Sequence, residues 1–448
     1  MLLTITFLFL VQQFINSKWI NAISDIYLLC MMIILLPLVK RGLNLFLLIL
    51  ILISALIFIV NEVPFRTIRE SITINQTLVA LFISVPFLGI PIKQQVYLEA
   101  LKQFFGRYMK NPTTFFLLTQ TFTHIMAVIL NVGAVTIFYY LSKAHPTVTS
   151  ARAKASPLLR GFSTALIWSP FFAAMALVTS QLPIEWINEL PFLLGFVFIS
   201  FTISFLLELT MNREAKQQCL SLENKDEGRK SINLIPLVDL FCYLLLIVSS
   251  VLLLDKLTAL SMVTLVILIA YVYPFIWMVS HHQWKKFIIE SVHYLFVTVP
   301  LIKNEVLLFL TAGFLSGAIA TTSFGAQLVQ FLNNWFGSST IGMAIFISLS
   351  VIILSICGFH PIMVITVYIT SLNPLEVGMS PMFFALLLLG SWGIATSISP
   401  MTAVSHLLAH EMKEKVFNIS IKWNATYSII SFILFMMYLT VLEQFNLI

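Results

Sequence analysis

Two stretches in the last quarter of the chain decide its fold: ICGFHPIMVITVYITSLNP (356–374) and GSWGIATSISPMTAVSH (390–406). Each places glycine or proline, together with polar side chains, inside an apolar run. These residues interrupt the hydrogen-bond ladder of a helix, and lipid offers the freed backbone groups no water. Such backbone is tolerated at membrane depth where protein buries it or water fills a cavity. We therefore predict a re-entrant hairpin with its tip at 357–361, and an unwound helix segment facing it at 397–402.

A matching pair of stretches lies earlier in the chain. The run AVILNVGAV (127–135) carries Asn131, and the run GFSTALIWSPFF (161–172) carries Pro170. Asn131 precedes Pro170 by 39 residues, and His360 precedes Pro400 by 40. The order of a broken run followed by a proline-interrupted run therefore occurs twice.

The composition indicates a polytopic membrane protein. Of 448 residues, 59% are hydrophobic and 10% are charged, whereas soluble domains carry roughly 25% charge. The net charge of +6 does not indicate nucleic-acid binding, because basic residues also mark the cytoplasmic loops of membrane proteins. The sequence has no CxxC pair and no HExxH motif, so we expect no metal site and no cofactor beyond a coupling ion.

Apolar segments close to the length that a bilayer requires predict ten spans. Residues 1–21 form an apolar segment that is a possible eleventh span, and two longer runs, 112–145 and 339–372, are predicted as re-entrant hairpins because each is broken near its centre. The ten spans are predicted at 22–39, 42–60, 76–92, 158–178, 190–209, 234–254, 258–280, 303–325, 380–409 and 425–445.

The spans divide into two halves, 22–209 and 234–448, joined by the polar loop 210–233. Five crossings per half is an odd number, so the second half is predicted to be inverted relative to the first. Basic residues should gather on the cytoplasmic side of short loops. If 210–233 is cytoplasmic, 21 of the 25 basic residues lie on that side, Arg160 among them, and 180–189 lies outside. The two hairpins would then enter from opposite faces and bring their tips together near the midplane.

This arrangement resembles the ion transporter superfamily, which includes divalent anion/sodium symporters, citrate carriers, arsenite and sodium/proton antiporters, and AbgT exporters. The resemblance covers the chain from about residue 22 to the end and lies more in architecture than in sequence. In the anion symporters each hairpin tip typically carries Ser-Asn-Thr, and the facing helix carries a Thr-Pro type break. Together the tip and the break bind sodium and the carboxylates of the substrate. Here the first tip, 130–133, keeps only the asparagine, and the second, 357–361, has none, so we assign no subfamily. The resemblance also implies a homodimer.

The candidate substrate site combines the two tips with the two breaks. Broken helices leave N-terminal amides that favour an anion and C-terminal carbonyls that favour a cation. Asn131 and His360 are also coupling candidates, because an asparagine oxygen can ligate sodium whereas a histidine titrates near neutrality and can carry a proton. The predicted substrate-binding residues are Asn131, Gly133, Ser169, Pro170, Gly358, His360, Thr396, Ser397, Ser399, Pro400 and Thr402.

For some of these residues a structural role is the competing interpretation. Serine and threonine in spanning helices often bond back to a carbonyl or join two helices. His124 and His406, which lie inside or near apolar runs, are predicted to be structural or interfacial, although an ionisable group at such a position is by default a functional hypothesis.

We predict a secondary active transporter, not an enzyme, in the plasma membrane, most simply of a bacterium, with a small anionic substrate and proton or sodium coupling. An enzyme or exporter of envelope polymers or lipid-linked glycans would need a large external loop with catalytic Arg, Asp or His, and the predicted external loops are short. An intramembrane hydrolase would need paired aspartates, a Ser/His pair or a zinc motif. A passive channel stays open as an alternative, because re-entrant hairpins also build pores. Substrate identity, direction of transport and coupling ion also stay open.

Overall fold

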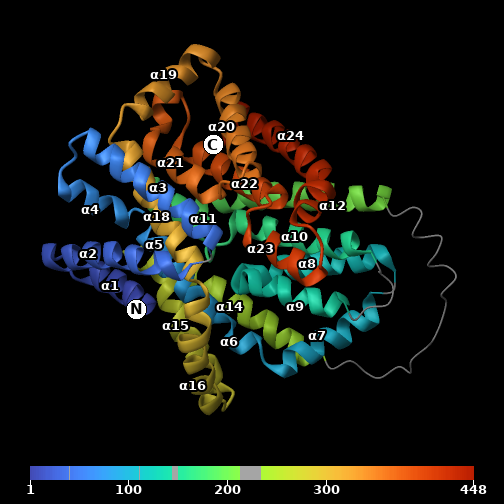
Figure 1. Ribbon diagram of the computed structural model, residues 1–448. Coiled ribbons are helices and arrows are strands. Elements are labelled where there is room, and N and C mark those ends of the chain that lie inside the picture. The colour runs from blue at the N-terminus through green and yellow to red at the C-terminus, as the bar shows by residue number, and fades with distance from the viewer. Residues whose placement is uncertain (40, 110, 144–149, 212–233) are drawn as a thin grey trace.

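The computed structural model describes residues 1–39, 41–109, 111–143, 150–211 and 234–448, and all regular elements in these ranges are helices (Figure 1). Within these ranges eleven helices are long and apolar enough to cross a membrane, which makes the chain a multi-pass membrane protein. Ten of them match the predicted spans. The eleventh is Pro112–Leu130, the first arm of a predicted hairpin, whereas the N-terminal helix α1 (Leu2–Phe14) is shorter than a span.

The helices follow one another in the same order in both halves: two spans, a short helix, a span, an amphipathic helix, a helix pair, an interrupted span and a last span. The first half comprises α2 (Lys18–Leu35), α3 (Arg41–Val60), α4 (Phe65–Thr73), α5 (Gln76–Ser84), α6 (Gly89–Ile92), α7 (Gln95–Tyr108), α8 (Pro112–Leu130), α9 (Val132–Lys143), α10 (Ala151–Trp168), α11 (Ala173–Gln181) and α12 (Trp186–Met211). The second comprises α14 (Ile235–Leu257), α15 (Met262–Ser280), α16 (Trp284–His293), α17 (Val299–Leu301), α18 (Lys303–Ala320), α19 (Phe324–Phe336), α20 (Thr340–Ile356), α21 (Pro361–Ser371), α22 (Pro381–Ile398), α23 (Ala403–Met412) and α24 (Trp423–Gln444). Of the predicted loop 210–233, residues 212–233 lie outside the described ranges.

Local sequence sets several helix starts. Asn111 and Thr114 form a capping box at the start of α8, with Pro112 at the first helical position. Ser380 caps α22, since its Oγ atom accepts from the amide of Phe383 at 2.9 Å, and Pro381 follows it. Proline suits this position because its missing amide would have no partner there.

The two interrupted spans form the centre of the fold. Across the apolar windows of Ala151–Gln181 and Pro381–Met412, 94% of residues are buried, against 22% in Gly42–Val60. Helices α10 and α22 cross at Gly393, where an added Cβ atom would lie 2.4 Å from Cγ1 of Ile167. The absence of a side chain therefore lets the two backbones approach closely. Figure 1 shows α2, α16 and α19 at the outer edges of the molecule.

Arg160, which the charge count assigned to the cytoplasmic side, lies inside α10, near the start of the predicted span 158–178. Its side chain is 1% exposed. The Nε atom donates to Oδ1 of Asn424 at 2.9 Å, Nη1 donates to Oγ of Ser204 at 3.2 Å, and the guanidinium lies 4.7 Å from the ring centroid of Tyr427. A buried charge is tolerated when its donors are bonded. The helix begins at Ala151, ahead of the apolar run from which the span was predicted.

Candidate functional site

Ser169 ends α10 and fixes the first break. Its Oγ atom donates to the carbonyl oxygen of Val128 on α8 at 3.0 Å and accepts from the amide of Phe171 at 3.2 Å. Ser169 is fully buried. The hydroxyl therefore replaces one helical hydrogen bond at Pro170 and ties the interrupted span to the first arm of the helix pair in its own half.

Ser399 ends α22 and fixes the second break with the same set of bonds. Its Oγ atom donates to the carbonyl oxygen of Ser355 on α20 at 2.7 Å and accepts from the amide of Met401 at 3.1 Å. It too is fully buried. Both halves thus use a Ser-Pro pair to end a helix and to bind the adjacent helix pair.

The turn of each helix pair has an unusual backbone. Asn131 adopts a positive φ of 51°, and its Oδ1 accepts from the amide of Val132 at 2.8 Å. Gly358 has a φ of 120°, which a residue with a side chain rarely adopts. His360 caps α21, since its Nδ1 atom accepts from the amide of Ile362 at 3.3 Å. The side chains predicted for coupling are therefore used in part to start α9 and α21.

Four helices begin at the tips and the breaks: α9 and α21 at the two tips, and α11 and α23 at the two breaks. A helix N-terminus carries partial positive charge from its unpaired amides. Thr402 caps α23 by accepting from the amide of Ser405 at 3.3 Å, whereas α11 has no side-chain cap. The first-turn amides of α11 thus lack the side-chain oxygen that pairs one of them in α23. Such amides are suited to an anion.

The two breaks differ in exposure. Phe171 and Phe172 at the first break are 1% and 3% exposed, whereas Met401 at the second is 42% exposed. Cys357 at the neighbouring tip and His406 on α23 are also exposed. The first break is therefore buried, whereas the second lies partly at the protein surface.

The second tip lies next to the second break. A Cβ atom added to Gly358 would lie 4.0 Å from Cε of Met401, and Phe359 packs edge-on against Phe46 of α3 with ring centroids 6.0 Å apart. At the first tip, a Cβ atom on Gly133 would come within 3.8 Å of Cβ of Leu130. The two prolines, Pro170 and Pro400, follow the serines at the breaks as predicted from the sequence.

Three predicted hydroxyl residues have different surroundings. Thr402 donates to Oγ of Ser405 at 2.9 Å, and that hydroxyl donates to the carbonyl oxygen of Ser399 at 2.9 Å. Ser397 is directed away from the break, because its Oγ bonds to Ser428 of α24 at 2.7 Å. Thr396 is 2% exposed, and its Oγ1 has no hydrogen-bond partner among the described residues. Ser397 thus joins two helices, and Thr396 has a free polar atom close to the break.

His124 is held on both ring nitrogens. The indole nitrogen of Trp168 donates to its Nε2 at 3.1 Å, so Nδ1 carries the proton and donates to Oγ1 of Thr164 at 3.0 Å. These bonds fix a neutral imidazole between α8 and α10. They agree with the structural role predicted for His124.

Glu189 is a buried carboxylate that sequence reasoning missed. It lies in α12, is 1% exposed, and its Oε2 has no hydrogen-bond partner within the part of the chain that the structure describes. One turn earlier, the indole of Trp186 donates to the carbonyl oxygen of Trp168 at 2.9 Å, at the end of α10. A carboxylate beside an apolar run was the available signal. The prediction missed Glu189 because residues 180–189 were assigned to an external loop.

Comparison with known proteins identifies no family. No family model matches the chain, and no curated protein matches it by sequence. Among solved structures, a search matches the chain to the Alcanivorax borkumensis YdaH transporter, whose crystal structure is described as having an unusual topology. The two share 12% identity with a TM-score of 0.41, over 94% of this chain and 98% of the other. At this level neither a common fold nor a common function follows from the similarity.

Proposed function

We propose that this protein is a secondary active transporter that moves a small anion by alternating access, driven by a proton or sodium gradient. The two halves would be inverted repeats, and α8–α9 and α20–α21 would be re-entrant hairpins whose tips enclose one substrate site. A bacterial plasma membrane and a homodimer complete the proposal, and no enzymatic step is part of it.

The observation that carries the proposal is the duplicated serine clamp. Each half contains an interrupted span whose terminal serine, Ser169 or Ser399, bonds both to the break and to a neighbouring helix pair. Interrupted backbone at the centre of a membrane fold is expected where it lines a substrate site. Two interrupted spans with the same set of serine bonds suit a protein in which first one half and then the other opens.

Unequal exposure of the breaks also supports alternating access. Met401 is 42% exposed while Phe171 is 1% exposed, so the two breaks are buried to different degrees. A continuous pore would leave both breaks accessible at once. This difference favours a transporter over a passive channel.

The helix ends favour an anionic substrate. The N-termini of α9, α11, α21 and α23 supply partial positive charge, and no lysine or arginine lies in the two tips or the two breaks. Dipoles and hydroxyls would therefore hold the anion. His360 on the second tip is the residue we assign to proton coupling, since imidazole is a poor ligand for sodium.

The test uses purified protein in proteoliposomes. Organic and inorganic anions are first screened for thermal stabilisation of the protein, with sodium and pH varied. Uptake of the best anion is then measured with and without an imposed sodium or pH gradient. Uphill accumulation that requires a gradient supports the proposal. Equilibration without accumulation would indicate a channel, and a chemically altered product would indicate an enzyme.

A further inference from the structure

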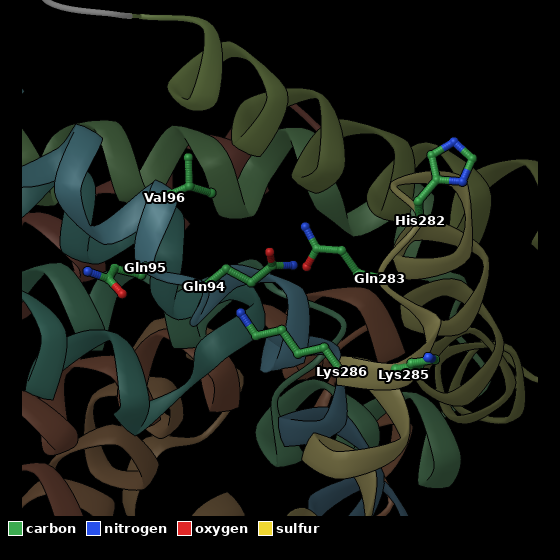
Figure 2. A pocket seen from close by; sticks show the side chains of 7 residues that line it. All are labelled: Gln94, Gln95, Val96, His282, Gln283, Lys285 and Lys286. Carbon is green, nitrogen blue, oxygen red and sulfur yellow. The ribbon is translucent and has the colours of Figure 1, made fainter.

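A polar cleft lies far from the breaks, between the start of α7 and the α15–α16 turn. Its volume is about 460 Å³. Figure 2 shows the cleft and the residues that line it, which are Gln94, Gln95, Val96, His282, Gln283, Lys285 and Lys286. None of them belongs to the proposed substrate site.

Two carboxamides and an ammonium group converge in the cleft. Figure 2 shows the side chains of Gln94, Gln283 and Lys286 directed toward its middle, whereas His282 and Lys285 lie at its edge. Gln94 is 6% exposed, and among the described residues its Nε2 atom donates only to the sulfur of Met278, at 2.9 Å. Thioether sulfur is a weak acceptor. The buried Oε1 of Gln283 has no partner among the described residues. The cleft therefore offers polar groups that the described part of the chain does not fully satisfy.

The carboxylates around the cleft are engaged elsewhere. Asp239 accepts a hydrogen bond from the hydroxyl of Tyr97 and lies 3.6 Å from Nε2 of His281. Burial, and next the bond to Asp239, raise the pKa of the Tyr97 hydroxyl, so it remains a donor. Glu290 interacts with Lys93. In the described part of the chain no carboxylate oxygen lies within 4.0 Å of Lys285 or Lys286. Among the described residues the two lysines of the cleft therefore have no carboxylate in direct contact.

An apolar surface continues from the cleft. Phe275, Ile276 and Val279 lie on one face of α15 and are 51%, 55% and 41% exposed. That face ends three residues before His282. On α16, which has no buried residue, Trp284 and Ile289 are 51% and 68% exposed. In a membrane protein such faces contact acyl chains, and a tryptophan marks the level of the headgroups. The positive cleft therefore opens at the border between lipid and water.

We propose that this cleft binds the phosphate of an anionic phospholipid, with the acyl chains along the exposed face of α15. Lys285 and Lys286 supply the charge, and the amide groups of Gln94 and Gln283 donate to phosphate oxygens and accept from headgroup hydroxyls. Phosphate recognition by lysine depends on point charge, and basic pockets beside spans on the cytoplasmic side bind anionic headgroups. A free phosphate ion has the same charged group but no chains for the apolar face, so the lipid is the better occupant.

The test is lipid retention by the full-length protein, measured by native mass spectrometry and thermal stabilisation in detergent. The probes are phosphatidylglycerol, phosphatidylcholine and inorganic phosphate. We expect phosphatidylglycerol to be retained and phosphatidylcholine to be lost. The double variant Lys285→Gln, Lys286→Gln should bind phosphatidylglycerol at least roughly tenfold more weakly. The matched control Lys413→Gln, Lys415→Gln removes the same charge outside the cleft and should bind normally.

A second variant separates the cleft from general surface charge. Gln283→Leu keeps both lysines and removes only the carboxamide, and it should lower phosphatidylglycerol retention without changing the unfolding midpoint in lipid-free detergent. Equal retention by the double-lysine variant and its control would overturn the proposal. So would stabilisation by inorganic phosphate that equals stabilisation by the lipid at the same concentration, because the site would then be one for a soluble anion.

Discussion

Removing the hydroxyl of one clamp serine should loosen the link between an interrupted span and its helix pair. Ser399→Ala leaves the carbonyl oxygen of Ser355 and the amide of Met401 without this partner. An unsatisfied buried group costs about 1–3 kcal/mol. Ser355 is fully buried, but Met401 is 42% exposed, so water can reach the amide. We therefore expect the free energy of unfolding to fall by about 1–3 kcal/mol, because the buried carbonyl of Ser355 loses its partner.

The equivalent change in the first half should cost more. Ser169→Ala leaves the carbonyl of Val128 and the amide of Phe171 unpaired, and these residues are 5% and 1% exposed. Neither group can be hydrated, so the free energy of unfolding should fall by roughly twice as much as in Ser399→Ala. Ser169→Ala is therefore expected to be the less stable of the two variants, because the first break is more deeply buried than the second.

The assay is unfolding by sodium dodecyl sulfate from a mild detergent, followed by tryptophan fluorescence. Ser250→Ala is the matched control, because the Ser250 hydroxyl donates only to the carbonyl of Leu246 in its own helix, at 2.8 Å. That carbonyl keeps its place in the helical ladder, and the change should stay within about 0.5 kcal/mol. If both clamp variants unfold like the control, the serines do not hold the helix pairs and the reasoning is wrong.

Three further changes test the breaks, the crossing and the coupling. Pro170→Ala and Pro400→Ala should each let an interrupted span extend its hydrogen-bond ladder, so that uptake into proteoliposomes falls more than expression does; normal uptake in both would mean ordinary kinks. Gly393→Ala should lower the unfolding midpoint, because its new Cβ atom would meet Ile167 at 2.4 Å, whereas Gly106→Ala, with nothing within 4 Å, should raise it slightly. His360→Gln should abolish the response of uptake to a pH gradient while substrate still stabilises the protein; strict sodium dependence in both proteins would contradict proton coupling.

The interruptions of the spans could be predicted because their signal is local. Glycine, proline and hydroxyl residues inside apolar runs located the ends of α8, α10, α20 and α22 to within a few residues. The same composition occurs twice, and this predicted the repeated order of helices. Capping residues such as Asn111 and Ser380 are local signals as well.

The partners of buried polar groups could not be predicted from the sequence. Arg160 bonds to Asn424, which is 264 positions away, and no pattern near either residue indicates the other. Ser397 and Ser399 are two positions apart, yet one joins α24 and the other clamps α20. Which of several hydroxyls faces a break depends on the rotation of the helix, and tertiary packing fixes that rotation. The start of α10 was missed for a related reason, since burial by neighbouring helices supports its polar first turns.

The crossing at Gly393 limits how the protein can change shape. A slide of α22 along α10 by one helical turn would bring Leu389 or Ser397 to the position that Gly393 now occupies. That position has no room even for one added carbon, since Ile167 would be 2.4 Å away and the carbonyl oxygen of Ser163 3.3 Å away. A slide that brings Leu389 or Ser397 to this position is therefore blocked. Under the proposed alternating access, a change of state that keeps this close contact would move α10 and α22 together as one rigid body, with the hinges in the connections around them.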